Sequence, residues 1–423
     1  MSSFDTLLAD FCPDEVTYTT MGELCSIITK QTGFDYSNHI KDSLQNEKTE
    51  HNVPYLQTKF FSGKDFDFNT DYYVPEEIVA AFPKITLDEK CILFSIVGAS
   101  IGNVGLFPGT PKAFLGGAIC VAKVLPQYSV EYIYYCVESE FVQSQIRNKI
   151  KGVGQATITI EDIRQFMIPM PSEEIQKEIV KTLGELKDKT DALIEKLSTE
   201  SRYRSAEYCY YRELLFSFSK DNEKEAVQWL ELGKACSLVT GATPSKTVKE
   251  YWENGTIPWM SSGEVNLKRV YSTENKITSL GYEKTSTSLV PPHSVVIALA
   301  GQGKTRGKVA ITEIELCTNQ SLCSIICGEK IYYKYLYHYL DSKYEDLRSI
   351  SNGDGSRGGL SLRILSPYKI PVPPLDEQQW IADILDRYEA QYSQLLSKLS
   401  EERDFYRKQY EYFRDQCFSY SKA

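Results

Sequence analysis

A long stretch of this chain occurs twice. Residues 168–218 align without a gap with residues 370–420, at a constant shift of 202 positions. Sixteen of the 51 aligned positions are identical, against about 3 expected from average residue usage. Because both copies must fold alike, the sequence predicts a chain built as two related halves.

Each copy of the repeat predicts one long helix. Pro171 in the first copy, and Pro373 with Pro374 in the second, end an extended entry. Ser172 or Asp376 can then cap the first turn, and Gln379 completes a capping-box pattern in the second copy. A helix of about 45 residues would be roughly 65–70 Å long.

The apolar residues of both helices recur in steps of four and three, which is a heptad pattern. The predicted seam consists of Ile179, Leu183, Leu186, Leu193, Leu197, Ile381, Leu385, Tyr388, Tyr392, Leu395 and Leu399. Thr190 is a polar interruption, and the stripe becomes aromatic further on, at Tyr208 and Tyr410. One helix cannot bury such a stripe alone, so the two helices most simply pair with each other. Two helices in independent bundles are the alternative.

The segments before the helices also correspond, more loosely. Residues 21–29 match 232–240, 53–61 match 257–265, 92–105 match 295–310, and 132–141 match 335–344. They mix short β-rich runs, glycine turns and one late helix, which predicts α+β globules. The expected domains are a globule at 1–170, a helix at 171–219, a globule at 220–372 and a helix at 373–423.

Charge is distributed unevenly between the globules. The chain carries a net charge of −10, which argues weakly against nucleic acid. Residues 1–170 hold 13 basic and 21 acidic side chains, whereas residues 229–372 hold 17 basic and 13 acidic ones. A basic surface is therefore compatible with the acidic chain, above all on its second half.

Other features of the composition favour a cytoplasmic protein without a metal centre. The 11 cysteines are scattered and the 4 histidines are isolated. Buried free thiols in a reducing compartment fit this pattern, and the ligand spacing of a zinc site is missing. An apolar run of the roughly 20 residues that a membrane span needs is also missing, so we expect no membrane partner.

One motif imitates a phosphate-binding loop. AGQGKT, at 300–305, resembles GxxxxGK[ST], but Ala298 occupies the place of the first glycine. The residues that follow are β-rich instead of helical. The motif therefore predicts a glycine-permitted turn between two strands, which holds Lys304, Arg306 and Lys308 outward. With dinucleotide, methyltransferase and nuclease motifs also missing, we expect no catalytic residue and no cofactor in this chain.

Two related globules, each followed by a long helix, suit a protein that reads a two-part DNA site. Arg, Lys, Asn, Gln, Ser and Thr side chains read base edges, and Lys, Arg and turn amides hold phosphates. In the first globule the candidates are Gln57, Lys59, Ser100, Asn103, Lys112, Gln155 and Thr157. In the second they are Lys246, Ser261, Ser262, Lys304, Arg306, Lys308 and Arg357. For each, the alternative is an ordinary solvated surface residue.

Gln155 and Arg357 belong to glycine-rich loops, GVGQAT and NGDGSRGG, which are counterparts in the two halves. Tyr55 and Trp259 also occupy equivalent positions. Each follows a proline into a strand-like run, so a role in the core is favoured over base stacking.

Several segments of the chain resemble a known family. The opening FCPDEVTYTTMGEL, the segment 241–266, the turn GQGKTRGKVAI and the helix entries IPMPSEEIQ and IPVPPLDEQ are similar to type I restriction–modification specificity subunits. The resemblance covers nearly the whole chain in the right order. The helix-entry repeat, with its spacing of about 200 residues, is its most specific part.

The resemblance implies that each globule is a target recognition domain reading one half of an asymmetric, interrupted sequence of double-stranded DNA. The helices would form an antiparallel coiled coil that sets the spacer. Two methyltransferase subunits would supply S-adenosylmethionine chemistry, and restriction subunits would supply ATP- and Mg-dependent translocation and cleavage. The acidic first globule departs from this expectation, because a surface that follows phosphates should be locally basic.

Two further interpretations stay open. The chain could be a coiled-coil adaptor that joins proteins without reading DNA, in which case it would show no preference among DNA sequences. It could also be the specificity subunit of a related two-subunit restriction system, which would share this fold and differ in its partner.

Overall fold

The computed structural model describes residues 16–150, 156–218, 227–301, 305–351 and 359–419. Two compact units are present: residues 1–197 with 401–423, and residues 198–400. Each unit combines one globule with a part of both long helices. We call the globules the first (16–170) and the second (227–372).

The first globule contains two four-stranded sheets. One has the order β2-β11-β8-β9 and the other the order β6-β3-β10-β7. Their strands are β2 (Cys25–Lys30), β11 (Ile119–Val124), β8 (Lys90–Ser95), β9 (Val104–Pro108), β6 (Tyr73–Pro75), β3 (Asn52–Leu56), β10 (Ala113–Leu115) and β7 (Thr86–Leu87). A separate pair, β1 (Thr17–Thr20) with β12 (Met167–Met170), joins the two ends of the globule.

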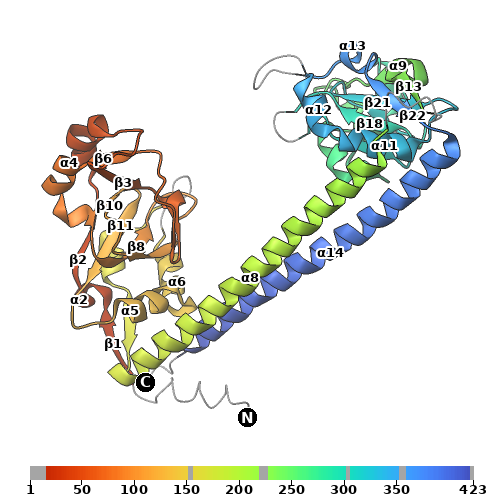
Figure 1. The fold of residues 1–423 in the computed structure, drawn as a ribbon. Coiled ribbons are helices and arrows are strands. Elements are labelled where there is room, and N and C mark those ends of the chain that lie inside the picture. The colour runs from red at the N-terminus through yellow and green to blue at the C-terminus, as the bar shows by residue number, and fades with distance from the viewer. Residues whose placement is uncertain (1–15, 151–155, 219–226, 302–304, 352–358, 420–423) are drawn as a thin grey trace. The chain divides into compact units, whose positions relative to one another are not determined.

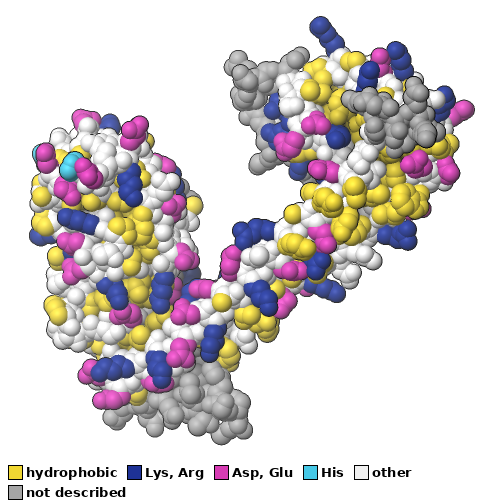
Figure 2. All heavy atoms as spheres, viewed as in Figure 1, with side chains coloured by type: hydrophobic (Ala, Val, Ile, Leu, Met, Phe, Trp, Pro, Cys, Tyr) yellow, Lys and Arg dark blue, Asp and Glu magenta, His cyan; other side chains and the backbone are white. Residues whose placement is uncertain are grey.

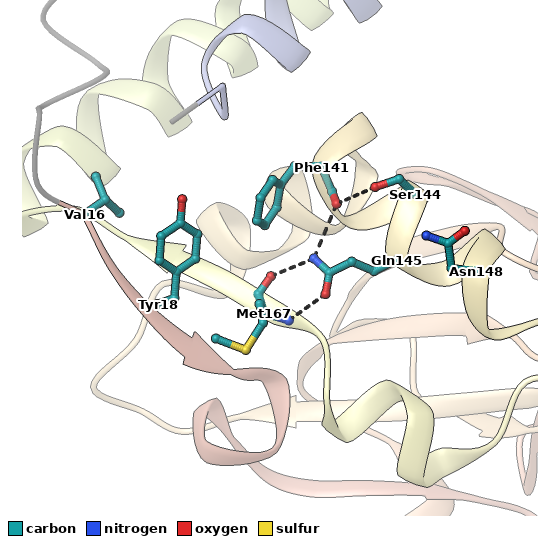
Figure 3. A pocket seen from close by; sticks show the side chains of 7 residues that line it. All are labelled: Val16, Tyr18, Phe141, Ser144, Gln145, Asn148 and Met167. Carbon is teal, nitrogen blue, oxygen red and sulfur yellow. Dashed lines mark hydrogen bonds between the residues drawn. The ribbon is translucent and has the colours of Figure 1, made fainter. Parts of the chain in front are cut away.

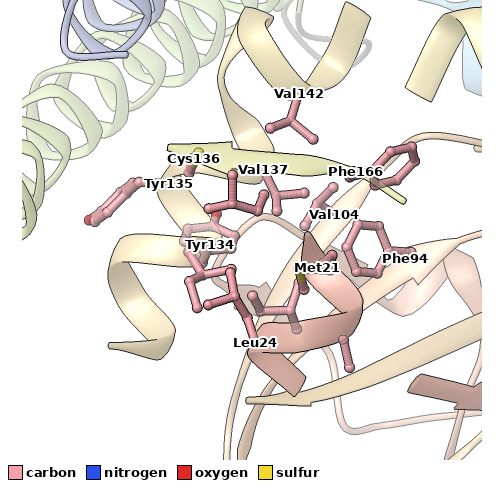
Figure 4. Packing of buried hydrophobic residues seen from close by; sticks show 14 of the residues in the cluster. Met21, Leu24, Phe94, Val104, Tyr134, Tyr135, Cys136, Val137, Val142 and Phe166 are labelled. Carbon is pink, nitrogen blue, oxygen red and sulfur yellow. The ribbon is translucent and has the colours of Figure 1, made fainter. Parts of the chain in front are cut away.

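The main core of the first unit lies between the β2-β11-β8-β9 sheet and the helices. Buried side chains of α5 (Val130–Glu138) and α6 (Glu140–Lys149) pack there against Met21, Leu24 and Phe94 (Figure 4). Ile179 and Leu183, from the first long helix, belong to the same cluster. The globule is therefore anchored on the helix that follows it.

The second globule repeats this plan. Its sheets have the orders β14-β21-β18-β19-β16 and β17-β15-β20, and β13 pairs with β22 as β1 does with β12. The strands are β13 (Gln228–Glu231), β14 (Cys236–Thr240), β15 (Ile257–Met260), β16 (Arg269–Val270), β17 (Asn275–Ile277), β18 (Val295–Ala298), β19 (Val309–Thr312), β20 (Cys317–Thr318), β21 (Leu322–Cys327) and β22 (Lys369–Val372). The predicted α+β class and the internal repeat are confirmed.

The predicted core role of Tyr55 and Trp259 is also confirmed, because Tyr55 is only 5% exposed and Trp259 only 4% exposed. Tyr55 lies on β3, which runs parallel to β10. Trp259 lies on β15, which runs parallel to β20. The two residues therefore occupy equivalent strands, as the sequence alignment predicts.

The long helices are α8 (Glu173–Leu215) and α14 (Leu375–Gln416). In the second unit they pair antiparallel, since Ser205 bonds to Tyr392 while Tyr211, further along α8, meets Tyr388, nearer the start of α14. In the first unit the ammonium group of Lys187 lies 5.6 Å from the ring centroid of Tyr410. The predicted pairing of the two helices is confirmed (Figure 1).

The predicted seam is wrong at one position in each helix. Leu193 is 40% exposed and its counterpart Leu395 is 36% exposed. A straight α-helix has 3.6 residues per turn, so a strict seven-residue repeat drifts away from the contact face. On α8 the contact face continues instead through the buried Thr190 and the half-buried Ile194.

The C-terminal end of each long helix packs on a globule. The end of α8 packs on the second globule, and the end of α14 packs on the first. Phe216, just after α8, packs edge-on against Tyr335 of α11 (Tyr333–Ser342), with 5.6 Å between ring centroids. Phe418, just after α14, packs against Tyr132 of α5 at 5.8 Å. Both tyrosine hydroxyls donate to a proline carbonyl, of Pro371 at 3.0 Å and of Pro169 at 2.8 Å. The repeat thus extends to individual contacts.

Candidate nucleic-acid interface

The two glycine turns are built alike. In the first globule Gly102 N donates to Ser95 O at 3.0 Å, and Ser95 N donates to Asn103 O at 2.9 Å. In the second, Gly307 N donates to Ala298 O at 2.9 Å, and Ala298 N donates to Lys308 O at 3.0 Å. Both glycines have positive φ, +89° and +85°, a conformation that favours glycine. Asn103 and Lys308 therefore occupy equivalent positions.

The turn in the second globule leads into a strand. AGQGKT is followed by β19, with no helix to receive a phosphate at its N-terminus. The prediction of a glycine-permitted turn between two strands is confirmed.

The end of each glycine-rich loop lies beside its turn. Val97 forms an isolated β-bridge with Thr157, so the structure brings Thr157 to the strand end from which Ser100 and Asn103 follow. In the second globule Leu360 N donates to Leu299 O at 2.8 Å. Gln155, Lys304 and Arg357, also predicted from these segments, lie outside the described residues.

Lys308 lines a cavity of about 300 Å³ with residues of two other elements. Its ammonium group donates to Asn266 Oδ1 at 2.7 Å. Arg212 of α8 and Lys268 also line this cavity, and so does Tyr344 of α12 (Tyr344–Ser349). Basic side chains therefore gather where α8 meets the glycine turn of the second globule.

Arg306 and Arg348 lie next to this cavity. The guanidinium group of Arg348 donates to Tyr344 Oη at 2.6 Å, and its side chain lies against Gly307. The Nε atom of Arg306 is buried and has no hydrogen-bond partner among the described residues. Arg306 is thus half-buried, whereas the sequence predicts that it points fully outward.

Only part of this positive charge is compensated. Arg212 pairs with Asp341 at 2.5 Å, and Lys268 pairs with Glu389 of α14. For Arg306, Lys308 and Arg348, the described part of the chain offers no carboxylate within ion-pair distance.

A second group of candidates follows the paired parallel strands. Gln57 and Lys59, just after β3, line a cavity of about 330 Å³ together with the backbone of residues 116–118. Lys59 pairs with the exposed Asp71. Lys112 is exposed but precedes β10, so it lies at the opposite end of that strand and apart from Gln57.

The equivalent strand ends in the second globule carry Ser261 and Ser262. Ser261 is engaged locally, since its N and Oγ donate to Glu264 Oε2 at 2.6 and 2.9 Å. Asn319 N donates to Met260 O, as Gly116 N donates to Leu56 O in the first globule. Asn319 and Gln320 therefore replace the glycines of the first globule. Sequence reasoning missed them, because only the strand pairing places them beside Ser261.

Lys246 lies apart from the basic cluster. It lines a cavity of about 340 Å³ with Lys249, Trp252, Trp259 and Asn275. The indole N–H groups of both tryptophans are satisfied by backbone carbonyls of the preceding loop. The aromatic rings therefore hold this loop in place, with Lys246 at its surface.

The first globule has a cavity beside α6 that sequence reasoning did not predict. Its lining includes Tyr18, Phe141, Ser144, Asn148 and Met167 (Figure 3). Gln145 bonds to both backbone polar groups of Met167, donating at 3.1 Å and accepting at 2.9 Å. The residues that line this cavity carry no charge.

A charged network fixes the second globule on α14. Asp386 accepts hydrogen bonds from His338 at 2.8 Å, Arg269 at 2.6 Å and Lys334 at 2.8 Å. Burial alone would raise the pKa of Asp386, but the bonds from His338 and Lys334 and the charge of Arg269 outweigh it and hold this pKa well below its usual range. These contacts orient the globule that carries the basic cluster.

The described residues contain neither a metal-binding cluster nor a candidate membrane span. Within the described ranges, His, Cys, Asp and Glu side chains form no group of three or more that could hold a metal ion. Among the helices of the described residues, none has the length and apolar character of a membrane span.

Comparison with known proteins identifies this architecture. The family model described as "Type I restriction modification DNA specificity domain" matches residues 13–200 and again residues 224–402. The specificity subunit of the type I restriction enzyme EcoR124I/EcoR124II of Escherichia coli is 34% identical over 307 residues, covering 69% of this chain and 71% of that protein. The EcoprrI specificity subunit of the same species is 30% identical and covers 46% of this chain and 51% of its own length.

Solved structures show the same fold. A chain in a structure described as the basis of complex assembly and conformational transition of the type I R-M system superposes with a TM-score of 0.73, at 17% identity, over 96% of this chain and 98% of that one. The HsdS subunit from Thermoanaerobacter tengcongensis gives a TM-score of 0.51, also at 17% identity, over 96% and 97%.

Proposed function

The chain belongs to the family of type I restriction modification DNA specificity proteins, and on this premise we propose that its two globules each read one half of an asymmetric, two-part DNA sequence. The helices α8 and α14 would hold the two halves at a fixed spacing. The observation that carries the proposal is the repetition of one whole unit: corresponding sheets, the same glycine turn and the same aromatic contact of a helix end on a globule.

The repeated turns and strand ends give the two globules the same backbone with different side chains for DNA contact. Asn103 and Lys308 lie at equivalent positions, and Gln57 and Ser261 follow equivalent strands. Because side chains differ at matching places, each globule can read a different half-sequence with the same backbone.

The partners would be methyltransferase and restriction subunits, and two exposed aromatic pairs support docking of two copies of one subunit. Tyr203 and Tyr210 on α8 are 61% and 62% exposed. Their counterparts on α14, Phe405 and Tyr412, are 59% and 58% exposed. Figure 2 shows hydrophobic side chains gathered on the helix surface close to the second globule. Large exposed aromatic side chains are typical of protein interfaces.

The chemistry would reside in those partners. S-adenosylmethionine would be bound by the methyltransferase subunits, and ATP and Mg by the restriction subunits, so this chain would contribute no catalytic residue. Reading chromosomal DNA would place the complex in the cytoplasm.

The test is protection of DNA by the chain in complex with its methyltransferase partner. A two-part site should be protected, Gln57→Ala should weaken protection of one half only, and Gln320→Ala, at the equivalent strand end of the second globule, should weaken the other half only. Competition with random-sequence duplex tests the adaptor interpretation. An adaptor would show no preference between the two-part site and the random-sequence duplex. Equal weakening of both halves by either variant would show that the assignment of globules to half-sites is wrong.

A further inference from the structure

Three basic side chains surround the glycine turn of the second globule without a carboxylate partner. They are Arg306 and Lys308 on the turn and Arg348 on α12. Arg348 is held by its bond to Tyr344 and by its packing on Gly307, so its position is fixed by the same fold that shapes the turn. We call these three residues the turn cluster.

The cavity beside the turn cluster adds further donors. Arg212 and Lys268 line it, and so does Asn266, which accepts a hydrogen bond from Lys308. The Nε atoms of Arg212 and Arg306 are both buried and lack hydrogen-bond partners within the described residues. Asp341 and Glu389 neutralise Arg212 and Lys268, which leaves the charges of the turn cluster available to a ligand.

Among the described residues, the matching place in the first globule is neutral. The hydrogen bonds of the two turns align Arg306 with Ile101 and Lys308 with Asn103. The helix segment that corresponds to Arg348, residues 143–146, reads Gln, Ser, Gln and Ile. The nearby Arg147 is paired with Glu140. As far as the described residues show, the duplicated fold therefore carries a cationic turn on one side only.

We propose that the turn cluster, with the adjoining cavity, binds phosphate groups of the DNA backbone, and that the first globule has no equivalent phosphate contact at its turn. Clustered guanidinium and ammonium groups match phosphate oxygens and release counterions on binding. Such contacts fix the position of a protein on the duplex and carry no sequence information. This inference rests on the proposed function, and it assigns the electrostatic part of DNA binding mainly to one globule.

The experiment measures the salt dependence of binding to a random-sequence duplex by the full chain in its methyltransferase complex. The slope of log K against log salt is negative. Lys308→Gln should make it shallower by about 0.9, the value for one phosphate contact. Lys308→Gln with Arg348→Gln should make it shallower by up to about 1.8. Lys308→Arg should keep the wild-type slope, because it keeps the charge.

Two matched variants serve as controls. Lys284→Gln removes one exposed positive charge elsewhere on the second globule, and Arg147→Gln removes the paired cation near the equivalent turn of the first globule. Both should leave the slope unchanged. A slope that falls equally with Lys284→Gln would show a mere effect of net charge, and an equal fall with Arg147→Gln would overturn the one-sided assignment.

Inorganic phosphate is titrated separately to distinguish a DNA backbone from a free anion. An unchanged slope in Lys308→Gln, together with lost binding of inorganic phosphate, would show a small-anion site and overturn the proposal. An unchanged slope without any binding of phosphate would overturn it as well. Absence of sequence preference in all variants would contradict the proposed function instead, so the two failures are distinguishable.

Discussion

The ring of Tyr208 on α8 lies parallel to the ring of Tyr392 on α14, with 5.1 Å between centroids and an angle of 6° between planes. The hydroxyl of Tyr392 is also hydrogen-bonded to Ser205 Oγ at 2.6 Å. In the first unit the counterparts of Tyr388 and Tyr392 are Leu186 and Thr190, so the aromatic stack is specific to the second unit. It fixes the register of the helix pair next to the second globule.

Tyr208→Ala should destabilise the helix pair of the second unit. The residue is 7% exposed, and replacing a large buried aromatic side chain by alanine costs about 3–5 kcal/mol. Urea unfolding followed by circular dichroism at 222 nm measures the loss. Tyr210→Ala, two residues along and 62% exposed, is the control and should change the free energy of unfolding by less than about 0.5 kcal/mol. Equal effects of the two variants would contradict the observed packing.

The lowered pKa of Asp386 predicts that the folded chain loses stability in acid. Its pKa in the folded chain lies below the value of about 3.9 for an unfolded chain, so the carboxylate stabilises the fold above that value. This contribution is lost as the pH falls from about 4 through the lowered pKa. Urea midpoints of the wild type should therefore fall below pH 4, whereas Asp386→Asn should have a lower midpoint at pH 7 and a weaker dependence below pH 4. Parallel curves for the two proteins would refute the role of the network.

The exposed aromatic pairs predict the stoichiometry of the complex. Tyr203→Ser with Tyr210→Ser should weaken the docking of one methyltransferase subunit, because it removes two exposed rings from one of two equivalent surfaces. Phe405→Ser with Tyr412→Ser should weaken docking of the other. Native mass spectrometry of the complex should find one bound methyltransferase subunit for each double variant and none for the combination. Two bound subunits in the combined variant would rule out these surfaces.

The helix pair predicts the spacer of the DNA site. Deleting residues 190–196 and 401–407, seven from each helix and all within the first unit, shortens each helix by about 10.5 Å. Seven residues keep the apolar face nearly in phase, since an α-helix drifts by only about 20° per heptad. The spacer should shorten by up to about 3 base pairs at 3.4 Å each. An unchanged spacer in the methylated motif would contradict a role of the helices as a ruler.

Much of the fold could be predicted because the repeat constrains it. The gapless alignment located both long helices, and the proline and capping signals placed their starts close to Glu173 and Leu375. Leu193 and Leu395 were misassigned, since an ideal heptad ignores the drift of a real helix. The sequence also offered no signal for the burial of the Arg306 Nε atom.

The candidate interface was predictable only in part. The glycine turns were recognised from sequence, whereas only the structure shows that Thr157 lies near Ser100 and Asn103. Arg348 was missed, because it joins Lys308 through the packing of α12 on the turn and follows it by 40 positions in the sequence. Asn319 and Gln320 were missed for the same reason. Contacts made by strand pairing across long separations leave no local pattern.

The most direct test of the two-part reading is a map of modified adenines in the genome of a cell that carries this chain with its methyltransferase partner. The account predicts one motif with two defined half-sequences, separated by a spacer of constant length and undefined sequence. Modified adenines in a single continuous motif, or the same motif in cells that lack the chain, would contradict it.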